Sequence, residues 1–435
     1  MTNYINNYFI ILFSLIPISL ILGSSVSLIN ILLIDISFLF LLIYLKDFSF
    51  FKNRSFQYLL FLYFYLIINS LISFDHTIGI SRNLGFIRLI IFFLAMNYFF
   101  KDERFLNKIL YTWTFIILII LIDVLFESFT GENILGYGAL YGRRIVSFFK
   151  DEPIVGGYLN AFYLLMIGFL HHRFKKKNKN LITIFALLIF ITILLTGERS
   201  NSIKALLGLL IFYILFKDYL MKYKLVSILV GFIILISLIF SSDFLKFRYL
   251  NQIKDNVEKN FFDNYFDHYK SGYNVFKENK FFGVGNKNYR VVACNIFNEK
   301  ADMIIADFGV PTEKFGSHGK KADQLIDDLG YRCSTHPHQI FFELLSEHGM
   351  IGTLVLLFLI YKLVLSNLLF KLKELNYIQI GSGIYILLIF LPLIPSGAFF
   401  SSFSITLFAL NLSIFYASNS KFNIFLNIEK DKLKI

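Results

Sequence analysis

Residues 181–200 read LITIFALLIFITILLTGERS, in which sixteen uncharged residues precede a polar end. A helix rises about 1.5 Å per residue, so runs near this length are the ones that cross about 30 Å of hydrocarbon. Other stretches are similar, and 56% of the 435 residues are hydrophobic whereas 17% are charged. Such a chain cannot present a soluble surface. The sequence therefore predicts an all-α polytopic membrane protein.

The apolar runs predict about twelve transmembrane helices, with one large hydrophilic loop domain between the ninth and the tenth. The first nine helices occupy residues 1–241, the loop domain 242–344, the last three helices 345–417 and a tail 418–435. The expected spans are 8–24, 27–45, 55–73, 84–100, 108–127, 155–171, 181–196, 203–217, 224–241, 345–366, 378–395 and 398–417.

The formal net charge of +12 comes mainly from basic residues in the short loops, so it does not indicate nucleic-acid binding. If the N-terminus is cytoplasmic, the inner loops carry most of these residues, and the densest group lies at 173–179. The positive-inside rule then predicts that both termini are cytoplasmic and that the loop domain is periplasmic. The N-terminus lacks the basic region and cleavage site of a secretory signal, so we expect it to be retained.

The loop domain contains two further patterns. Aromatic residues at near-helical spacing within 264–280 predict an amphipathic helix that lies along the membrane surface. The chain has two cysteines, Cys294 and Cys333, and both fall in this domain. An oxidising periplasm favours a disulfide between them, and two free thiols are the alternative.

Residues 333–352, CSTHPHQIFFELLSEHGMIG, place His336-Pro337-His338 directly before a membrane helix on the outer side. The partial positive charge of a helix N-terminus disfavours imidazolium, so His338 or His336 is placed to act as a neutral general base. The alternative is that these histidines lie in a surface turn and have no catalytic role. A metal site with Glu343 is a third, but two ligands flanking Pro337 are poorly arranged for tetrahedral closure.

Arginines on the expected outer side form a second pattern. Arginine presents a planar fork of donors that matches phosphate oxygens, and Arg88 falls within an apolar span, where an ionisable group is costly. These residues predict a site for an anionic ligand at the outer edge of the membrane. Contact with lipid headgroups is the alternative, and it suits Arg82 best. The arginines are Arg82, Arg88, Arg143, Arg144, Arg199 and Arg290.

Acidic residues are weaker candidates. We expect Asp151 and Glu152 to be solvated or paired with neighbouring arginines, although contact with an acceptor is an alternative. Asp35 and Asp123 fall in apolar runs, where we interpret them as features of helix ends or packing.

These motifs, in this order, resemble the O-antigen ligase and O-antigen polymerase superfamily over residues 140–420. The resemblance rests on the polar end of residues 196–200, on ENKFFGVG at 278–285, on 147–156, and on the HPHQ and EHGMIG motifs within 336–352. The family usually has Asn after the second histidine, whereas this chain has Gln339.

The resemblance implies a metal-independent membrane glycosyltransferase that needs no cofactor. Such an enzyme moves a glycan from undecaprenyl diphosphate to a sugar hydroxyl at the periplasmic face of the bacterial inner membrane. His338 matches the family's essential histidine, and Arg199 and Arg290 match arginines that would hold the diphosphate. His336 would orient the turn or the acceptor. The other candidates for substrate binding are Gln339, Arg143, Arg144, Arg88 and His268.

Three functions remain open. A ligase would use lipid A-core as acceptor, and the histidine turn is closer to that branch; a polymerase would use another lipid-linked glycan with the same chemistry. A flippase or transporter of lipid-linked glycans is the alternative from another class, but it should show paired broken helices and charges at the membrane midplane. A membrane scaffold without activity is the remaining alternative.

Overall fold

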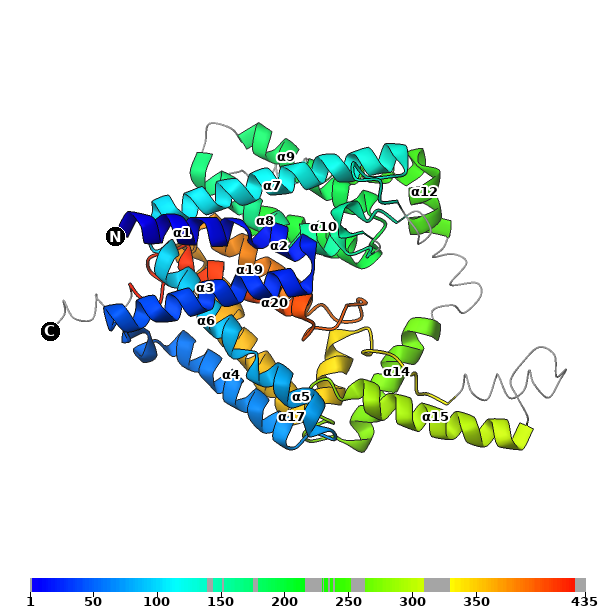
Figure 1. Ribbon diagram of the computed structural model, residues 1–435. Coiled ribbons are helices and arrows are strands. Elements are labelled where there is room, and N and C mark those ends of the chain that lie inside the picture. Colours follow the sequence, from blue (N-terminus) through cyan, green and yellow to red (C-terminus); the bar gives the residue numbers. More distant parts are fainter. Residues whose placement is uncertain are drawn as a thin grey trace.

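The computed structural model describes residues 2–138, 144–150, 152–174, 179–215, 229, 231–233, 235–237, 239–251, 263–308 and 329–426. Within these ranges the regular elements are helices, and a single β-bridge joins Glu132 to Gly138 (Figure 1). The all-helical fold predicted from the sequence is therefore confirmed.

The helices of the N-terminal part follow the predicted spans closely. They are α1 (Thr2–Ser14), α2 (Ile16–Leu22), α3 (Ser24–Leu45), α4 (Arg54–Leu71), α5 (His76–Leu84), α6 (Ile87–Phe100), α7 (Glu103–Thr130), α8 (Val155–Phe174), α9 (Lys179–Leu195) and α10 (Arg199–Leu215).

The C-terminal part contains the predicted loop domain and the last spans. Its helices are α12 (Asp243–Lys246), the π-helical turn Phe247–Asn251, α14 (Asp263–Glu278), α15 (Tyr289–Phe308), α17 (Ile340–Ile360), the π-helical turn Tyr361–Leu365, α18 (Ser366–Phe370), α19 (Tyr377–Ile389) and α20 (Ser402–Ala417). Short 3-10 turns lie at Ser49–Lys52, Ser147–Phe149 and Leu372–Glu374.

Five helices in the described ranges are long and apolar enough to cross a membrane: Tyr4–Leu22, Ser24–Leu45, His76–Phe100, Glu103–Thr130 and Ile340–Phe370. Shorter apolar helices include Leu181–Leu195, Tyr377–Ile389 and Ser402–Ala417. The chain is thus a multi-pass membrane protein by length and composition. The count of twelve spans, the orientation and the periplasmic placement of the loop domain stay predictions, and the expected span 224–241 lies partly outside the described residues.

Some expected spans have other boundaries. The span 378–395 ends early, at Ile389, because Pro392 and Pro395 cannot continue a helix. The expected span 84–100 corresponds to α6, which begins at Ile87, and α5 directly precedes it. The last long helix begins at Ile340, so the first residues after the histidine turn belong to α17 and not to the loop domain.

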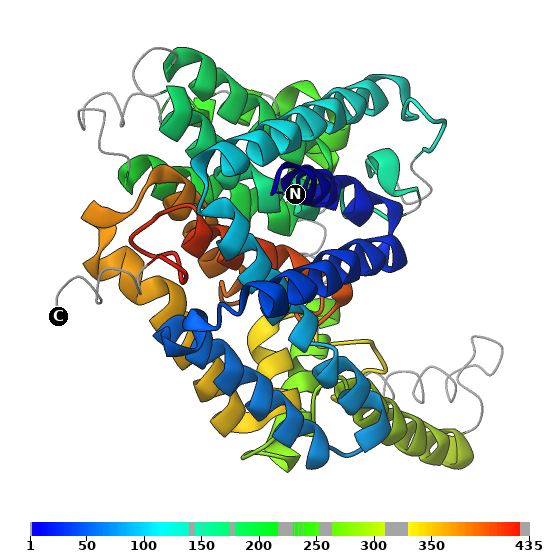
Figure 2. The same ribbon diagram turned by 60° about the vertical axis from the view of Figure 1, so that its left-hand side comes forward.

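Helix α8 forms the centre of the bundle and is buried along most of its length. It packs closely against α19, where a Cβ on Gly168 would lie 2.3 Å from the Tyr377 carbonyl and one on Gly381 would lie 2.1 Å from the Leu164 carbonyl. Small residues permit such close helix contacts in membranes. Helices α14 and α15 lie at the end of the bundle away from the start of α1, as both views show (Figures 1 and 2).

Helix α17 is broken at Gly349, where the backbone takes φ 64° and ψ −170°. The segment 280–285 pairs with both sides of the break. The N–H groups of Val284 and Gly285 donate to Ser346 and Glu347 at 2.9 and 2.8 Å, and the carbonyls of 280 and 281 accept from 350 and 351 at 2.8 and 3.1 Å. Backbone groups freed by a break must find partners inside a membrane protein, and this segment supplies them.

We predict that Gly349→Ala destabilises the protein by about 3 kcal/mol or more, because the new Cβ would lie 2.3 Å from the Phe281 carbonyl and φ is positive. The matched control is Gly136→Ala, where φ is 79° but nothing lies within 4 Å, so the cost is about 1 kcal/mol. Thermal unfolding in detergent measures both. Equal shifts for the two variants would show that the pairing at the break contributes little.

Candidate active site

The histidine turn, residues 336–338, is held between the start of α17 and the loop before α20. The Ser396 N–H donates to the His338 carbonyl at 2.8 Å, and the Ser396 carbonyl accepts from His336 Nε2 at 3.1 Å. His338 has φ 57°, an uncommon conformation for a residue with a side chain. The neighbouring segments therefore hold a strained backbone at this position.

The partners of the two imidazoles assign different roles to them. Because Nε2 of His336 faces a carbonyl, it carries the proton, and Nδ1 accepts from the Thr335 hydroxyl at 2.9 Å. Both nitrogens of His336 are thus occupied. No described residue hydrogen-bonds the ring of His338, so its lone pair is available to a substrate.

Three histidine rings lie together at this turn. The ring centroid of His338 lies 4.2 Å from that of His336 and 4.5 Å from that of His268, which α14 contributes. Burial is the main cause that lowers the pKa of His336 and of His338 to about 4 each, and the charges of neighbouring groups contribute to this lowering. Burial, followed by the charge of Arg332, also lowers the pKa of His268. The imidazoles are neutral at neutral pH, as expected, but burial and not the helix N-terminus is the main cause.

A cavity of about 1060 Å³ opens beside the turn. His336 and Thr335 line it together with residues from the α2–α3 connection and from α5, α6 and α15. Among its described lining residues Glu152 is the single acidic side chain, against five cationic ones: Arg82, Arg88, Lys150, Lys287 and Arg290. The predicted residues Arg88, Arg290 and His336 therefore meet in one cavity, which is suited to an anion.

Two of the cavity arginines have defined surroundings. Arg82 donates from Nη1 to the Phe400 carbonyl at 3.1 Å and to Ser402 Oγ at 3.2 Å, so it is more than a lipid-facing residue. Arg88 lies close enough to the buried carboxylate of Asp35 to attract it, although no described residue hydrogen-bonds that carboxylate. Asp35 thus has a charged neighbour that its sequence context did not reveal.

Arg199 and Arg144 belong to a second group, with Arg248. Their charges act on Arg248, whose pKa is lowered by burial and by these two neighbours, and Arg248 Nε donates to the Gly197 carbonyl at 3.0 Å. Arg199 begins α10 and is not among the described lining residues of the large cavity. Arg290 lines that cavity, whereas the described electrostatic neighbour of Arg199 is Arg248. The prediction that Arg199 and Arg290 hold one diphosphate stays a prediction.

Of the remaining candidates, some hydrogen-bond to the backbone and stabilise the fold, and others lie outside the residues that the structure describes. Gln339 caps α17, since its Oε1 accepts from the N–H groups of Phe341 and Phe342 at 2.8 and 3.1 Å. Glu343 accepts from the Phe399 N–H at 3.0 Å with both oxygens. No cluster of three His, Cys, Asp or Glu side chains suited to a metal ion occurs in the part that the structure describes. Arg143 and Asp151 lie outside that part.

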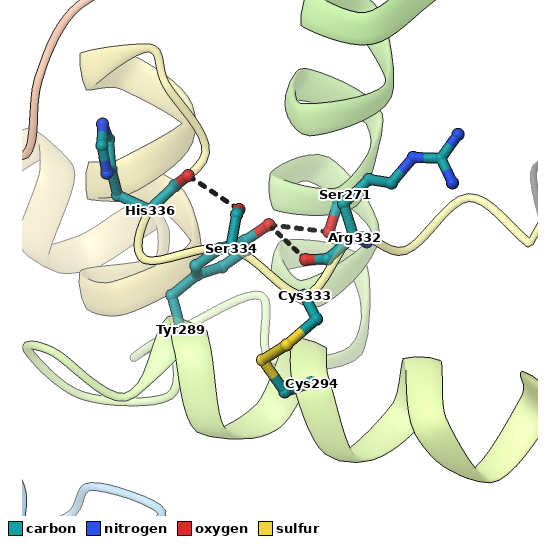
Figure 3. Close-up of a disulfide and its surroundings, with 7 residues drawn as sticks. All are labelled: Ser271, Tyr289, Cys294, Arg332, Cys333, Ser334 and His336. Carbon is teal, nitrogen blue, oxygen red and sulfur yellow. Dashed lines mark hydrogen bonds between the residues drawn. A yellow bond between two sulfur atoms is a disulfide. The ribbon is translucent and has the colours of Figure 1, made fainter. Parts of the chain in front are cut away.

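The disulfide between Cys294 and Cys333 is present, as predicted (Figure 3). It joins α15 to the extended segment that leads into the histidine turn. Tyr289 and Ser271 pair at 2.7 Å beside it, and Ser334 Oγ donates to the His336 carbonyl at 3.0 Å. A crosslink over a sequence separation of 39 residues stabilises the folded state by about 4 kcal/mol in the chain-entropy description. The first turn of α15, which carries Arg290, is thereby tied to the histidines.

The sequence did not point to Lys287 or Lys150 as residues of the site, and Arg82 was interpreted as a residue that contacts lipid headgroups. Lys287 follows a glycine-rich turn and has φ 66°, a conformation that carries no sequence signal for a lysine. The contacts of Arg82 come from residues more than three hundred positions away, so no local pattern could have shown them.

Fold and site together define a multi-pass helical membrane protein with a cationic cavity beside a neutral histidine turn. Residues 184–357 match the family described as O-antigen ligase. This match covers less than half of the chain. It supports the resemblance to the O-antigen ligase and polymerase superfamily seen in the sequence, and it suggests a membrane glycosyltransferase-type enzyme. No curated protein matches the chain.

We predict that acidification destabilises the protein through the histidine turn. Imidazoles titrate near pH 6.5 in an unfolded chain but near 4 at His336 and His338, so protons bind the unfolded state first. Stability contributed by these residues is present above about pH 6.5 and is lost as the pH falls towards 4. The melting temperature of His336→Asn/His338→Asn should therefore fall less between pH 7 and 4.5 than that of the wild type. His76→Asn is the control, and identical pH slopes for all three proteins would contradict the assignment.

Proposed function

We propose that the chain is an O-antigen ligase-like glycosyltransferase. It moves a glycan from undecaprenyl diphosphate to a sugar hydroxyl of lipid A-core, at the periplasmic face of the bacterial inner membrane, and it uses neither a cofactor nor a metal ion. The observation that carries the proposal is the cavity of about 1060 Å³, where a buried neutral histidine turn shares a wall with five cationic side chains. A lipid-linked diphosphate matches this combination of charge and location.

In the proposed reaction His338 is the general base. An imidazole nitrogen of His338 takes the proton of the acceptor hydroxyl as its oxygen bonds to the anomeric carbon. The bond between that carbon and the phosphate oxygen breaks, its electron pair stays on the oxygen, and undecaprenyl diphosphate leaves. The low pKa of His338 keeps the base unprotonated, and the absence of a hydrogen bond to its ring from the described residues supports this role.

The cations would stabilise the charge that builds on the leaving diphosphate. Arg290 and Arg88 serve in this role together with Arg82 and Lys287, because all four line the cavity. The proposed role of Arg199 rests on the family resemblance, since Arg199 belongs to the second arginine group. His336 holds the turn through Ser396 and Thr335, which supports an orienting role.

The acceptor distinguishes ligase from polymerase, and the same cavity would serve both. One observation favours a transporter: α17 is broken at Gly349, and broken helices are typical of transporters. This break, however, is filled by the backbone of residues 280–285, whereas a transporter would leave broken backbone exposed to a substrate path. We therefore keep transport as the alternative from another class.

We predict that Arg290→Ala and His338→Ala each lower glycan transfer at least about 100-fold, because each removes a group that acts in the transition state. The gene is deleted, each variant is returned on a plasmid, and lipopolysaccharide is separated on a gel. Loss of polymer from the core while lipid-linked polymer accumulates indicates a ligase; a core with a single repeat unit indicates a polymerase.

Arg104→Ala is the matched control, because this arginine is exposed at the start of α7 and is not a lining residue of the cavity. It should restore wild-type glycans. Unchanged lipopolysaccharide after deletion, or full activity of Arg290→Ala and His338→Ala, would overturn the proposal.

A further inference from the structure

A second, smaller chamber shares the Ser396 region with the histidine turn and is lined by both apolar and polar residues. It measures about 250 Å³ and is lined by α8, α10, the start of α17, the end of α19, the loop 396–399 and α20. The large cavity lies next to it, since Ile154 and Phe403 line both. At about 30 Å³ per water molecule in the liquid, the chamber has room for about eight, which is enough for one sugar ring.

Lys204 is the unusual residue of the chamber. It lies on α10, its side chain is 9% exposed, and it lines the chamber. No described residue hydrogen-bonds or pairs with it, and the carboxylate of the nearby Glu198 is occupied by the N–H groups of Gly156 and Gly157 at 2.6 and 3.2 Å and by Asn201 Nδ2 at 2.6 Å. An unpaired cation in an apolar bundle is costly and marks a functional site by default.

Two further polar groups of the chamber also lack partners. Asn160 Oδ1, on a residue that is 3% exposed, and Ser396 Oγ have no hydrogen bond from the described residues. Both atoms are shielded from the chamber, so a ligand bound there would not contact them directly. The rings of Tyr385, Phe399 and Phe403 line the same chamber and offer apolar surface to the C–H faces of a sugar.

Ser396 connects the chamber to the candidate active site. Its backbone makes two hydrogen bonds to the histidine turn, at 2.8 and 3.1 Å, and the same residue is part of the chamber lining. A ligand bound in the chamber would therefore lie next to the turn that carries His338. This position suits a sugar unit of a substrate that reacts there.

We propose that this chamber is a saccharide subsite, in which the unpaired Lys204 ammonium binds the carboxylate of an acidic sugar unit of the glycan substrate. This inference rests on the proposed function, because that function supplies the glycan. A carboxylate gives the buried ammonium its missing counter-charge through a charge-assisted hydrogen bond.

The test uses the full-length protein in nanodiscs and two probes that differ in one group, methyl galacturonoside and methyl galactoside. Saturation-transfer NMR gives their affinities. We expect the uronoside to bind at least about tenfold more tightly than the neutral glycoside, and Lys204→Met to abolish this preference. Lys108→Met, an exposed lysine on α7, is the matched control and should retain the preference.

Lys204→Arg serves as a second variant in case Lys204→Met does not fold. It keeps the positive charge, so it should retain the preference for the uronoside. Equal binding of the two probes by the wild type, binding of neither, or a preference that survives Lys204→Met overturns the inference. The outcome is separable from the proposed function: glycan transfer that depends on Arg290, with no uronoside preference, rejects the subsite alone.

Discussion

The backbone pairing between residues 280–285 and the broken part of α17 is the contact on which the site depends. It connects the first half of α17, which begins directly after the histidine turn, to the segment that leads into Lys287 and Arg290. The disulfide between Cys294 and Cys333 makes a second connection between the same two parts. Together they bring His336 from one segment and cations from another to the same cavity, and the His338 ring lies beside that of His336, at 4.2 Å between centroids.

Electrostatics explains why the base and the cations can share this region. Burial keeps the histidine rings uncharged, so they add no repulsion to a cavity that already contains five cationic side chains. Four of these cations, Arg82, Arg88, Lys287 and Arg290, would meet a diphosphate as one group. A cavity of this charge attracts most strongly a ligand that has several negative charges, and a lipid-linked diphosphate is such a ligand.

The sequence was a good guide to features that depend on local composition. Apolar runs predicted the helices, and cysteine placement predicted the disulfide, because hydrophobic length and redox compartment determine these features. It was a poor guide to tertiary contacts. The motif Glu347-His348-Gly349 lies in an apolar run that predicts one continuous helix, yet Gly349 breaks α17. Arg82 hydrogen-bonds to residues far away in the chain, Lys204 lies in a chamber formed by helices that are distant in the sequence, and Arg199 and Arg144 act electrostatically on Arg248.

The most direct test is reconstitution of the purified protein in liposomes with an undecaprenyl-diphosphate-linked glycan, lipid A-core and EDTA. The account predicts that glycan appears on the core while an equal amount of undecaprenyl diphosphate is released. A donor that remains intact, or that moves across the membrane without losing its glycan, would contradict it.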